Sequence, residues 1–166
     1  HAAVYAADQL FATRDTTSRR LSIEGAGNIV ISDTVGFIRD LPHSLVDAFH
    51  ATLEAAADAD VLLHVVDSAS HARDEQVAEV NKVLAEIGAE RVPQVVVWNK
   101  IDLTEASPGV GRDEYGNIAR VRVSARSGEG LDLLRESLAE YARAKAEARR
   151  KALDAAEREA HNDYIN

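Results

Sequence analysis

The sequence predicts an α/β domain in which a sheet carries helices on both of its faces. Two continuous apolar runs, residues 61–66 and 95–98, are typical of strands buried on both sides, as in a parallel sheet. Apolar residues at helical spacing occupy residues 77–87, between these runs, and recur from Leu131 onward. Strands and helices that alternate in this way along one chain form open α/β sheets.

Length and composition indicate one globular domain, because the chain has 166 residues and 46% of them are apolar, enough for a hydrophobic core. It has no cysteine, which excludes disulfides, thiolate metal sites and a cysteine nucleophile. No apolar run approaches the roughly 20 residues that span a bilayer. The net charge of −9 disfavours broad nucleic-acid binding but allows a local basic patch. We expect a soluble, cytoplasmic protein.

The N-terminal third is expected to contain a β-hairpin and a helix. Residues 1–20 lack a sustained period, which is typical of a helix end followed by a loop. Short runs rich in branched residues at 21–23 and 29–31 flank the turn sequence at 25–28, which predicts a hairpin. Apolar residues then recur at helical spacing over 41–53 and predict a helix.

Further along, each segment extends the alternating pattern. Residues 104–117 are rich in turn formers and are expected to form a surface loop. Residues 118–123 alternate apolar and charged side chains, which is typical of an edge strand. A helix is expected from Leu131 to about Tyr141, followed by an Ala-, Arg- and Glu-rich helical tail that projects into solvent. We therefore divide the chain into a domain at 1–141 and a tail at 142–166.

Polar residues follow three of the predicted strands, and ligands of open α/β sheets bind at the carboxyl ends of strands. The sequence Asn99-Lys100-Ile101-Asp102 follows the strand predicted at 95–98. A carboxylate such as Asp102 accepts two parallel hydrogen bonds from a flat donor edge, and guanine has one while adenine does not. Asn99 can tie neighbouring loops together, and the apolar stem of Lys100 can lie over the base. The alternative is an ordinary polar turn.

The other strand ends carry weaker signals for the same chemistry. Asp33-Thr34-Val35-Gly36 has the form D-x-x-G, in which Asp33 could hold Mg²⁺ through water and the Gly36 N–H could contact a γ-phosphate. The N–H of Ala125, after Ser124, could meet the carbonyl oxygen of guanine. Thr13 could supply a hydroxyl to Mg²⁺, and Thr17 is a rival for that role.

Taken together and in order, these motifs resemble the HflX family of ribosome-associated GTPases. The resemblance is carried by residues 5–13, Tyr-Ala-Ala-Asp-Gln-Leu-Phe-Ala-Thr, and by residues 33–42, Asp-Thr-Val-Gly-Phe-Ile-Arg-Asp-Leu-Pro. It extends from about Val4 to about Tyr141. One departure falls just after the first of these segments, where Arg14 and Thr16 stand in place of the family's usual Leu and Pro.

The resemblance implies a P-loop NTPase-type fold, that of the translation-factor-related GTPases, which binds GTP or GDP with Mg²⁺. It also implies association with the large ribosomal subunit, through rRNA or ribosomal proteins, to rescue or split stalled ribosomes. We expect a monomer that is cytoplasmic, in part on the ribosome or at a membrane. The implied metal ligands are Thr13 and Asp33, and the implied nucleotide-binding residues are Phe11, Ala12, Thr13, Arg14, Asp15, Asp33, Thr34, Val35, Gly36, Asn99, Lys100, Ile101, Asp102, Ser124, Ala125 and Arg126.

Phe37 occupies the position after the D-x-x-G glycine, where related GTPases often place a Gln that orients the attacking water. Phenylalanine cannot hydrogen-bond to water. We therefore assign no catalytic residue and expect slow hydrolysis unless the ribosome or another group places the water.

No G-x-x-x-x-G-K-[ST] sequence occurs in the chain, and none of its four lysines follows a glycine. The resemblance therefore implies a G domain that lacks its first strand and phosphate-binding loop, is marginally folded and binds GTP poorly by itself. Two alternatives stay open, a GTPase whose N-terminal part precedes His1, or a truncated product that serves as a non-hydrolysing fragment or ribosome-binding module. An in-frame phosphate loop upstream of His1 would support the first.

Three further features receive structural interpretations. His64, inside an apolar run, is interpreted as a core histidine, and Asp67 as a loop cap near the nucleotide. The tail carries a basic stretch that we interpret as a solvated helix face, with an rRNA or ribosomal-protein contact as the alternative. Its residues are Arg143, Lys145, Arg149, Arg150 and Lys151.

Overall fold

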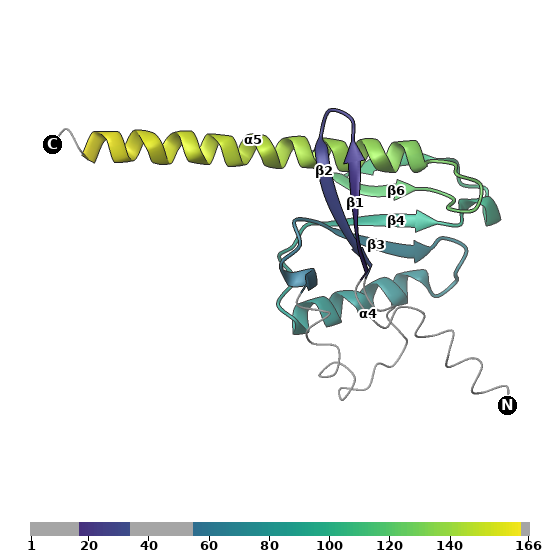
Figure 1. The fold of residues 1–166 in the computed structure, drawn as a ribbon. Helices are drawn as coiled ribbons and strands as arrows, with labels where there is room; N and C mark the ends of the chain where they lie inside the picture. The colour runs from purple at the N-terminus through teal and green to yellow at the C-terminus, as the bar shows by residue number, and fades with distance from the viewer. Residues whose placement is uncertain (1–16, 34–54, 164–166) are drawn as a thin grey trace.

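The computed structural model describes residues 17–33 and 55–163, which form two separate sheets and two long helices (Figure 1). The smaller sheet is the predicted hairpin, β1 (Thr17–Ile23) and β2 (Gly27–Asp33), paired antiparallel with Leu21 opposite Ile29. The helix predicted over 41–53 and residues 1–16 of the segment predicted to be a helix end and loop lie outside the described residues. Residues 17–20, which were expected to continue that loop, belong to β1, so this part of the prediction is wrong.

The larger sheet has four strands in the order β3-β4-β6-β5. Its first three strands, β3 (Leu62–Asp67), β4 (Gln94–Asn99) and β6 (Ile118–Arg122), run parallel, while β5 (Gly109–Arg112) pairs antiparallel with β6 at one edge. Asp67 stands opposite Asn99 in the register of β3 and β4. The polar residues that follow the parallel strands therefore meet at one end of the sheet.

Helices cover both faces of this sheet, as predicted. Val97 belongs to the buried cluster against which Leu131 and Leu134 of α5 (Leu131–Asp163) pack. Its neighbour Val96 points to the opposite face, because successive strand residues alternate. There it lines a pocket together with Val77 of α4 (Arg73–Glu86). The sheet therefore separates α4 from α5.

The hydrophobic core lies on the α5 face of the two central strands. Its buried members are Val95, Val97, Val121 and Val123, each at most 6% exposed. The central position of β4, with a parallel neighbour on either side, explains its continuous apolar run. The apolar run of β3 was expected to be buried on both faces, and this is wrong for Val65, which is 59% exposed. β3 is the outer strand of this sheet, and α5 packs over β6 and β5 instead.

Two predictions between residues 104 and 123 need correction. The segment expected to be a surface loop contains β5, and the strand expected at the sheet edge is β6, which lies between β4 and β5. The alternation in β6 was misread as an edge pattern. It arises because Val121 faces the core while Arg120 faces the side of the sheet that carries Trp98, which is only partly covered.

The predicted C-terminal helix and the predicted helical tail form one continuous helix of 33 residues, α5. Its first turns pack on the sheet, and the Tyr141 hydroxyl donates to the carbonyl oxygen of Asp60 at 3.0 Å. Side chains from Arg143 to Arg158 are exposed, and the helix extends well beyond the sheet (Figure 1). The expected projection into solvent is confirmed, while the division into a domain and a tail stays a prediction.

His64 gives the fold a specific pH dependence. His64 was interpreted as a core histidine with its hydrogen bonds satisfied, and this is wrong for Nδ1, which is buried without a hydrogen-bond partner among the described residues. Burial lowers the pKa of the imidazole from its usual value of 6.5. The unfolded chain then binds a proton more readily than the folded chain, so acid favours unfolding. We expect the free energy of unfolding to fall as the pH decreases below about 6.5, and to fall less in His64→Leu. Urea unfolding at pH 7.5 and pH 5.5 measures this difference, and equal losses in the two proteins would contradict it.

Candidate functional site

Asn99 joins the two loops that follow β4 and β6. Its Oδ1 accepts hydrogen bonds from the backbone N–H of Lys100 at 2.8 Å and of Ala125 at 2.9 Å. Because both partners are donors, the amide must present its oxygen to them, and its NH₂ group donates to no described residue. One half-buried side chain thereby fixes the distance between the two loops.

Asp102 is held by Ser124 from the second loop. The Ser124 hydroxyl, which is fully buried, donates to Asp102 Oδ1 at 2.6 Å. The same hydroxyl oxygen accepts the N–H of Ser127 at 3.1 Å, so its orientation is set from both sides. Asp102 itself is exposed. Its carboxylate is therefore anchored at one oxygen and accessible to a ligand.

The backbone of the first loop turns sharply to bring Asp102 toward Ser124. Lys100 adopts a left-handed conformation with φ of 65°, the one described non-glycine residue with positive φ. The short helical turn η1 (Ile101–Leu103) follows at once, and the Ile101 N–H donates to the carbonyl oxygen of Val123 at 3.3 Å. Ile101 is buried beneath the loop.

Lys100 forms an ion pair with Asp67, which ends the neighbouring strand β3. Lys100 Nζ lies 2.7 Å from Asp67 Oδ2, while Asp67 Oδ1 accepts the N–H of Ala69 at 3.0 Å. The hydrogen bond from Lys100, more than any other cause, lowers the pKa of the Asp67 carboxyl. The pair therefore persists at neutral and mildly acidic pH, and it fixes the ammonium end of Lys100 while the apolar stem spans the loop.

The arrangement offers an accessible carboxylate and an amide NH₂ that donates to no described residue, both at the ends of β4 and β6. A carboxylate oxygen accepts N–H groups, and an amide NH₂ donates to a ring nitrogen or carbonyl. The Ala125 N–H, expected to meet a base carbonyl, already donates to Asn99 Oδ1. Contact with a base would require that N–H to be shared between two acceptors, as three-centre hydrogen bonds are.

The structure brings together seven of the predicted nucleotide-binding residues, at 99–102 and 124–126. Asp33 is described at the end of β2, in the hairpin that has no strand pairing with the four-stranded sheet. Thr17, the rival to Thr13, begins β1. The predicted residues at 11–15 and 34–36, together with Phe37, lie outside the described residues.

Sequence reasoning missed two contributors to this end of the sheet. Asp67 does cap its loop, as interpreted, but its pairing with Lys100 was not foreseen. Ser68 donates both its N–H and its hydroxyl to the carbonyl oxygen of Asn99, at 2.9 and 2.7 Å. The available signal was the parallel pairing of β3 with β4, which sets Asp67 opposite Asn99.

Comparison with known proteins assigns the chain to a family. The sequence matches the family described as "50S ribosome-binding GTPase" over residues 1–100. It is 49% identical over 140 residues to "GTPase HflX" of Escherichia coli strain K12, and 46% identical over 134 residues to "GTPase HflX" of Caldanaerobacter subterraneus. The chain belongs to the HflX family of GTPases. The alignments cover 84% and 81% of this chain but 33% and 30% of those HflX proteins, so the chain spans about a third of their length.

A solved structure agrees with the HflX assignment and shows the P-loop GTPase fold. It is a GTP-binding protein from Sulfolobus solfataricus in complex with GDP, with a TM-score of 0.63 and 30% sequence identity. The match covers 81% of this chain and 47% of that one. The fold class predicted from the sequence is therefore confirmed.

A glycine closes the loop that carries Ser124 and Ala125. A Cβ added at Gly130 would lie 2.3 Å from the carbonyl oxygen of Arg122, and the φ of Gly130 is +74°. Gly128 has a similar φ of +86° but open space around it, which makes it a matched control. We expect Gly128→Ala to cost about 1 kcal/mol of unfolding free energy, from backbone conformation alone.

Gly130→Ala must displace backbone as well as adopt the strained φ. We expect it to cost at least about 2 kcal/mol more than Gly128→Ala, within the range of overpacking penalties. Urea unfolding of the two variants beside the parent chain measures the difference. Equal losses would show that the loop does not depend on the close approach of Gly130 to Arg122.

Proposed function

We propose that the ends of β4 and β6 bind the guanine base of GTP or GDP, and that the chain forms the base-reading part of a ribosome-associated GTPase. The observation that carries the proposal is the hydrogen bond from buried Ser124 to Asp102, which presents the carboxylate beside the amide of Asn99. Family membership supports the same reading, since the matching HflX proteins are named as GTPases.

Guanine presents a ring N–H and an exocyclic NH₂ on one edge, and a single carboxylate accepts both. Asp102 would accept this pair, while the free NH₂ of Asn99 would donate to a ring nitrogen. Adenine would leave the carboxylate without a donor pair, and a buried or partly buried unpaired group costs binding energy. The stem of Lys100, with its ammonium held by Asp67, would pack over the base.

We further propose that the complete protein binds the phosphates of GTP, coordinates Mg²⁺ and hydrolyses the nucleotide. Mg²⁺ would accompany the nucleotide, with Thr13 and Asp33 as the proposed ligands. No cluster of three or more metal-ligating side chains occurs in residues 17–33 and 55–163, so the phosphates and water would complete the coordination. The partner we propose is the large ribosomal subunit, in the cytoplasm, where the complete protein would rescue or split stalled ribosomes. None of the described helices is long and apolar enough to cross a membrane.

A second candidate function rests on a motif that residues 1–166 do not contain. Residues 1–166 contain no G-x-x-x-x-G-K-[ST] loop, and hydrolysis needs the phosphate contacts that such a loop supplies. For residues 1–166 taken by themselves, this observation favours base binding or ribosome binding without hydrolysis of GTP. Both candidate functions require that Asp102 binds guanine, and this contact can be tested directly.

The test exchanges the hydrogen-bonding pattern at position 102. Asp102→Asn replaces one acceptor oxygen with an NH₂ donor, which matches xanthine, whose edge carries a ring N–H beside a carbonyl oxygen. We expect GDP to shift the amide NMR signals of Lys100, Asp102 and Ala125 in the parent chain, and ADP to leave them unchanged. In Asp102→Asn, xanthosine diphosphate should bind at least tenfold more tightly than GDP.

Asp154→Asn is the matched control, because Asp154 lies in the exposed half of α5 and the variant carries the same change of charge. It should retain the parent preference for GDP over ADP. If GDP and ADP shifted the same signals with equal affinity, or if the preference of Asp102→Asn for xanthosine diphosphate were absent, Asp102 would not read the base.

A further inference from the structure

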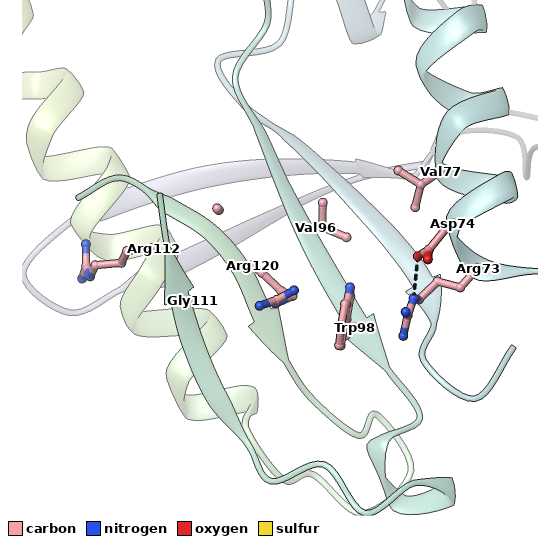
Figure 2. Close-up of a pocket in the computed structure, with 9 residues that line it drawn as sticks. Arg73, Asp74, Val77, Val96, Trp98, Gly111, Arg112 and Arg120 are labelled. Carbon is pink, nitrogen blue, oxygen red and sulfur yellow. Dashed lines mark hydrogen bonds and ion pairs between the residues drawn. The ribbon is translucent and has the colours of Figure 1, made fainter. Parts of the chain in front are cut away.

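A shallow pocket lies on the face of the sheet opposite the core, between α4 and the edge strand β5. It has a volume of about 380 Å³ and is lined by Arg73, Val77, Trp98, Gly111, Arg112 and Arg120, among others. Figure 2 shows Arg120 of β6, Trp98 of β4 and Arg73 of α4 next to one another, while Arg112 of β5 points away from them. The pocket is separate from the proposed guanine site, which lies beyond the strand ends.

Two arginines stack on the single tryptophan of the chain. The guanidinium carbons of Arg73 and Arg120 each lie 4.2 Å from the centre of the Trp98 ring. Figure 2 shows Trp98 between them, so one guanidinium covers each face of the indole. Such stacking is favourable for a cation over an aromatic ring. It also fixes the planes of the two guanidinium groups and spares a ligand the cost of ordering them.

Arg120 has no carboxylate partner among the described residues, unlike its neighbours. Arg73 pairs with Asp74 at 3.1 Å, and Arg112 pairs with Glu140 at 2.8 Å. The Nε of Arg120 is buried without a hydrogen-bond partner among the described residues, so this N–H has lost water without gaining an acceptor. Gly111, opposite Arg120 in the sheet, has no side chain, and the guanidinium of Arg120 lies over it: a Cβ added there would be 3.5 Å from Nε and Nη2 of Arg120.

The charge of this pocket is opposite to that of the whole chain. The chain has a net charge of −9, yet the side chains lining the pocket include three arginines and one carboxylate, Asp74. An anion is therefore the ligand that the pocket favours. Arginines whose planes are fixed in this way are suited to a polyanion, because guanidinium groups bind phosphate oxygens through parallel hydrogen bonds.

We propose that the Arg73–Trp98–Arg120 stack is an RNA-binding site that contacts the phosphodiester backbone of a single-stranded or looped RNA segment. This inference deepens the proposed ribosome association by naming RNA, rather than a ribosomal protein, as what this face contacts. It does not depend on nucleotide binding at Asp102.

Trp98 provides a direct readout, because it is the only tryptophan in the chain. We would titrate the chain, without nucleotide, with a 12-nucleotide oligouridylate and follow tryptophan fluorescence at several salt concentrations. We expect a saturable change in emission, and an affinity that falls linearly with the logarithm of salt concentration. Arg120→Ala should bind roughly tenfold more weakly and with a shallower salt dependence, because one charge-assisted phosphate contact is lost.

Arg91→Ala is the matched control, since Arg91 is exposed in the turn before β4 and lies outside the pocket. It should bind RNA like the parent chain. Arg120→Lys, which keeps the charge but not the planar stack, should fall between the parent and Arg120→Ala, and it carries the test if Arg120→Ala does not fold.

Three results would overturn the proposal. The first is RNA binding without a change in Trp98 emission, and the second is equal affinity in the Arg120 and Arg91 variants. The third is binding of polyglutamate as tight as that of RNA, which would indicate an acidic protein partner instead. GDP binding is measured by a different signal, the amide NMR shifts of Asp102 and Ala125. A negative result for RNA binding therefore does not argue against the proposed guanine site, and a negative result for GDP binding does not argue against the RNA site.

Discussion

The side-chain amide of Asn99 is the interaction on which the candidate site depends. Its oxygen accepts one N–H from the loop after β4 and another from the loop after β6, so one short side chain sets the distance between them. This is possible because β4 and β6 are parallel neighbours whose carboxyl ends reach the same level. The left-handed turn at Lys100 then brings Asp102 within reach of buried Ser124. Loss of any one of these contacts would separate the carboxylate from the amide.

The same two strands serve two surfaces of different chemistry. β4 contributes Trp98 to the open face of the sheet and Asn99 to its end, while β6 contributes Arg120 to that face and leads into Ser124. At the strand end, the cation Lys100 is neutralised by Asp67, which leaves an acceptor-rich site suited to a base edge. On the open face, Arg120 has no such partner among the described residues, which leaves a positive pocket on an acidic chain. In β4, Trp98 lines the pocket on the open face, and the next residue, Asn99, belongs to the candidate site at the strand end.

The sequence was sufficient to predict that the loops after β4 and β6 meet, because parallel strands end together and polar residues follow them. The third predicted strand end, at Asp33, belongs to the separate hairpin. The sequence could not predict the pairing of Asp67 with Lys100, since that contact depends on the register between β3 and β4. It also failed at β5, whose Gly-Val-Gly-Arg sequence has little intrinsic strand preference and becomes a strand by pairing with β6. Without β5, the alternation of β6 was misread as a sheet edge.

The central claim is that Asp102 accepts both donors of the guanine edge, and inosine diphosphate tests it most directly. Inosine retains the ring N–H and lacks only the exocyclic NH₂, so it removes one of the two hydrogen bonds and leaves the phosphates and ribose unchanged. Calorimetric titration of the chain with GDP and with inosine diphosphate should give at least tenfold weaker binding for the second, the effect of one hydrogen bond to a charged group. Equal affinity for the two nucleotides would contradict the account, because the carboxylate would then not distinguish guanine by its donor pair.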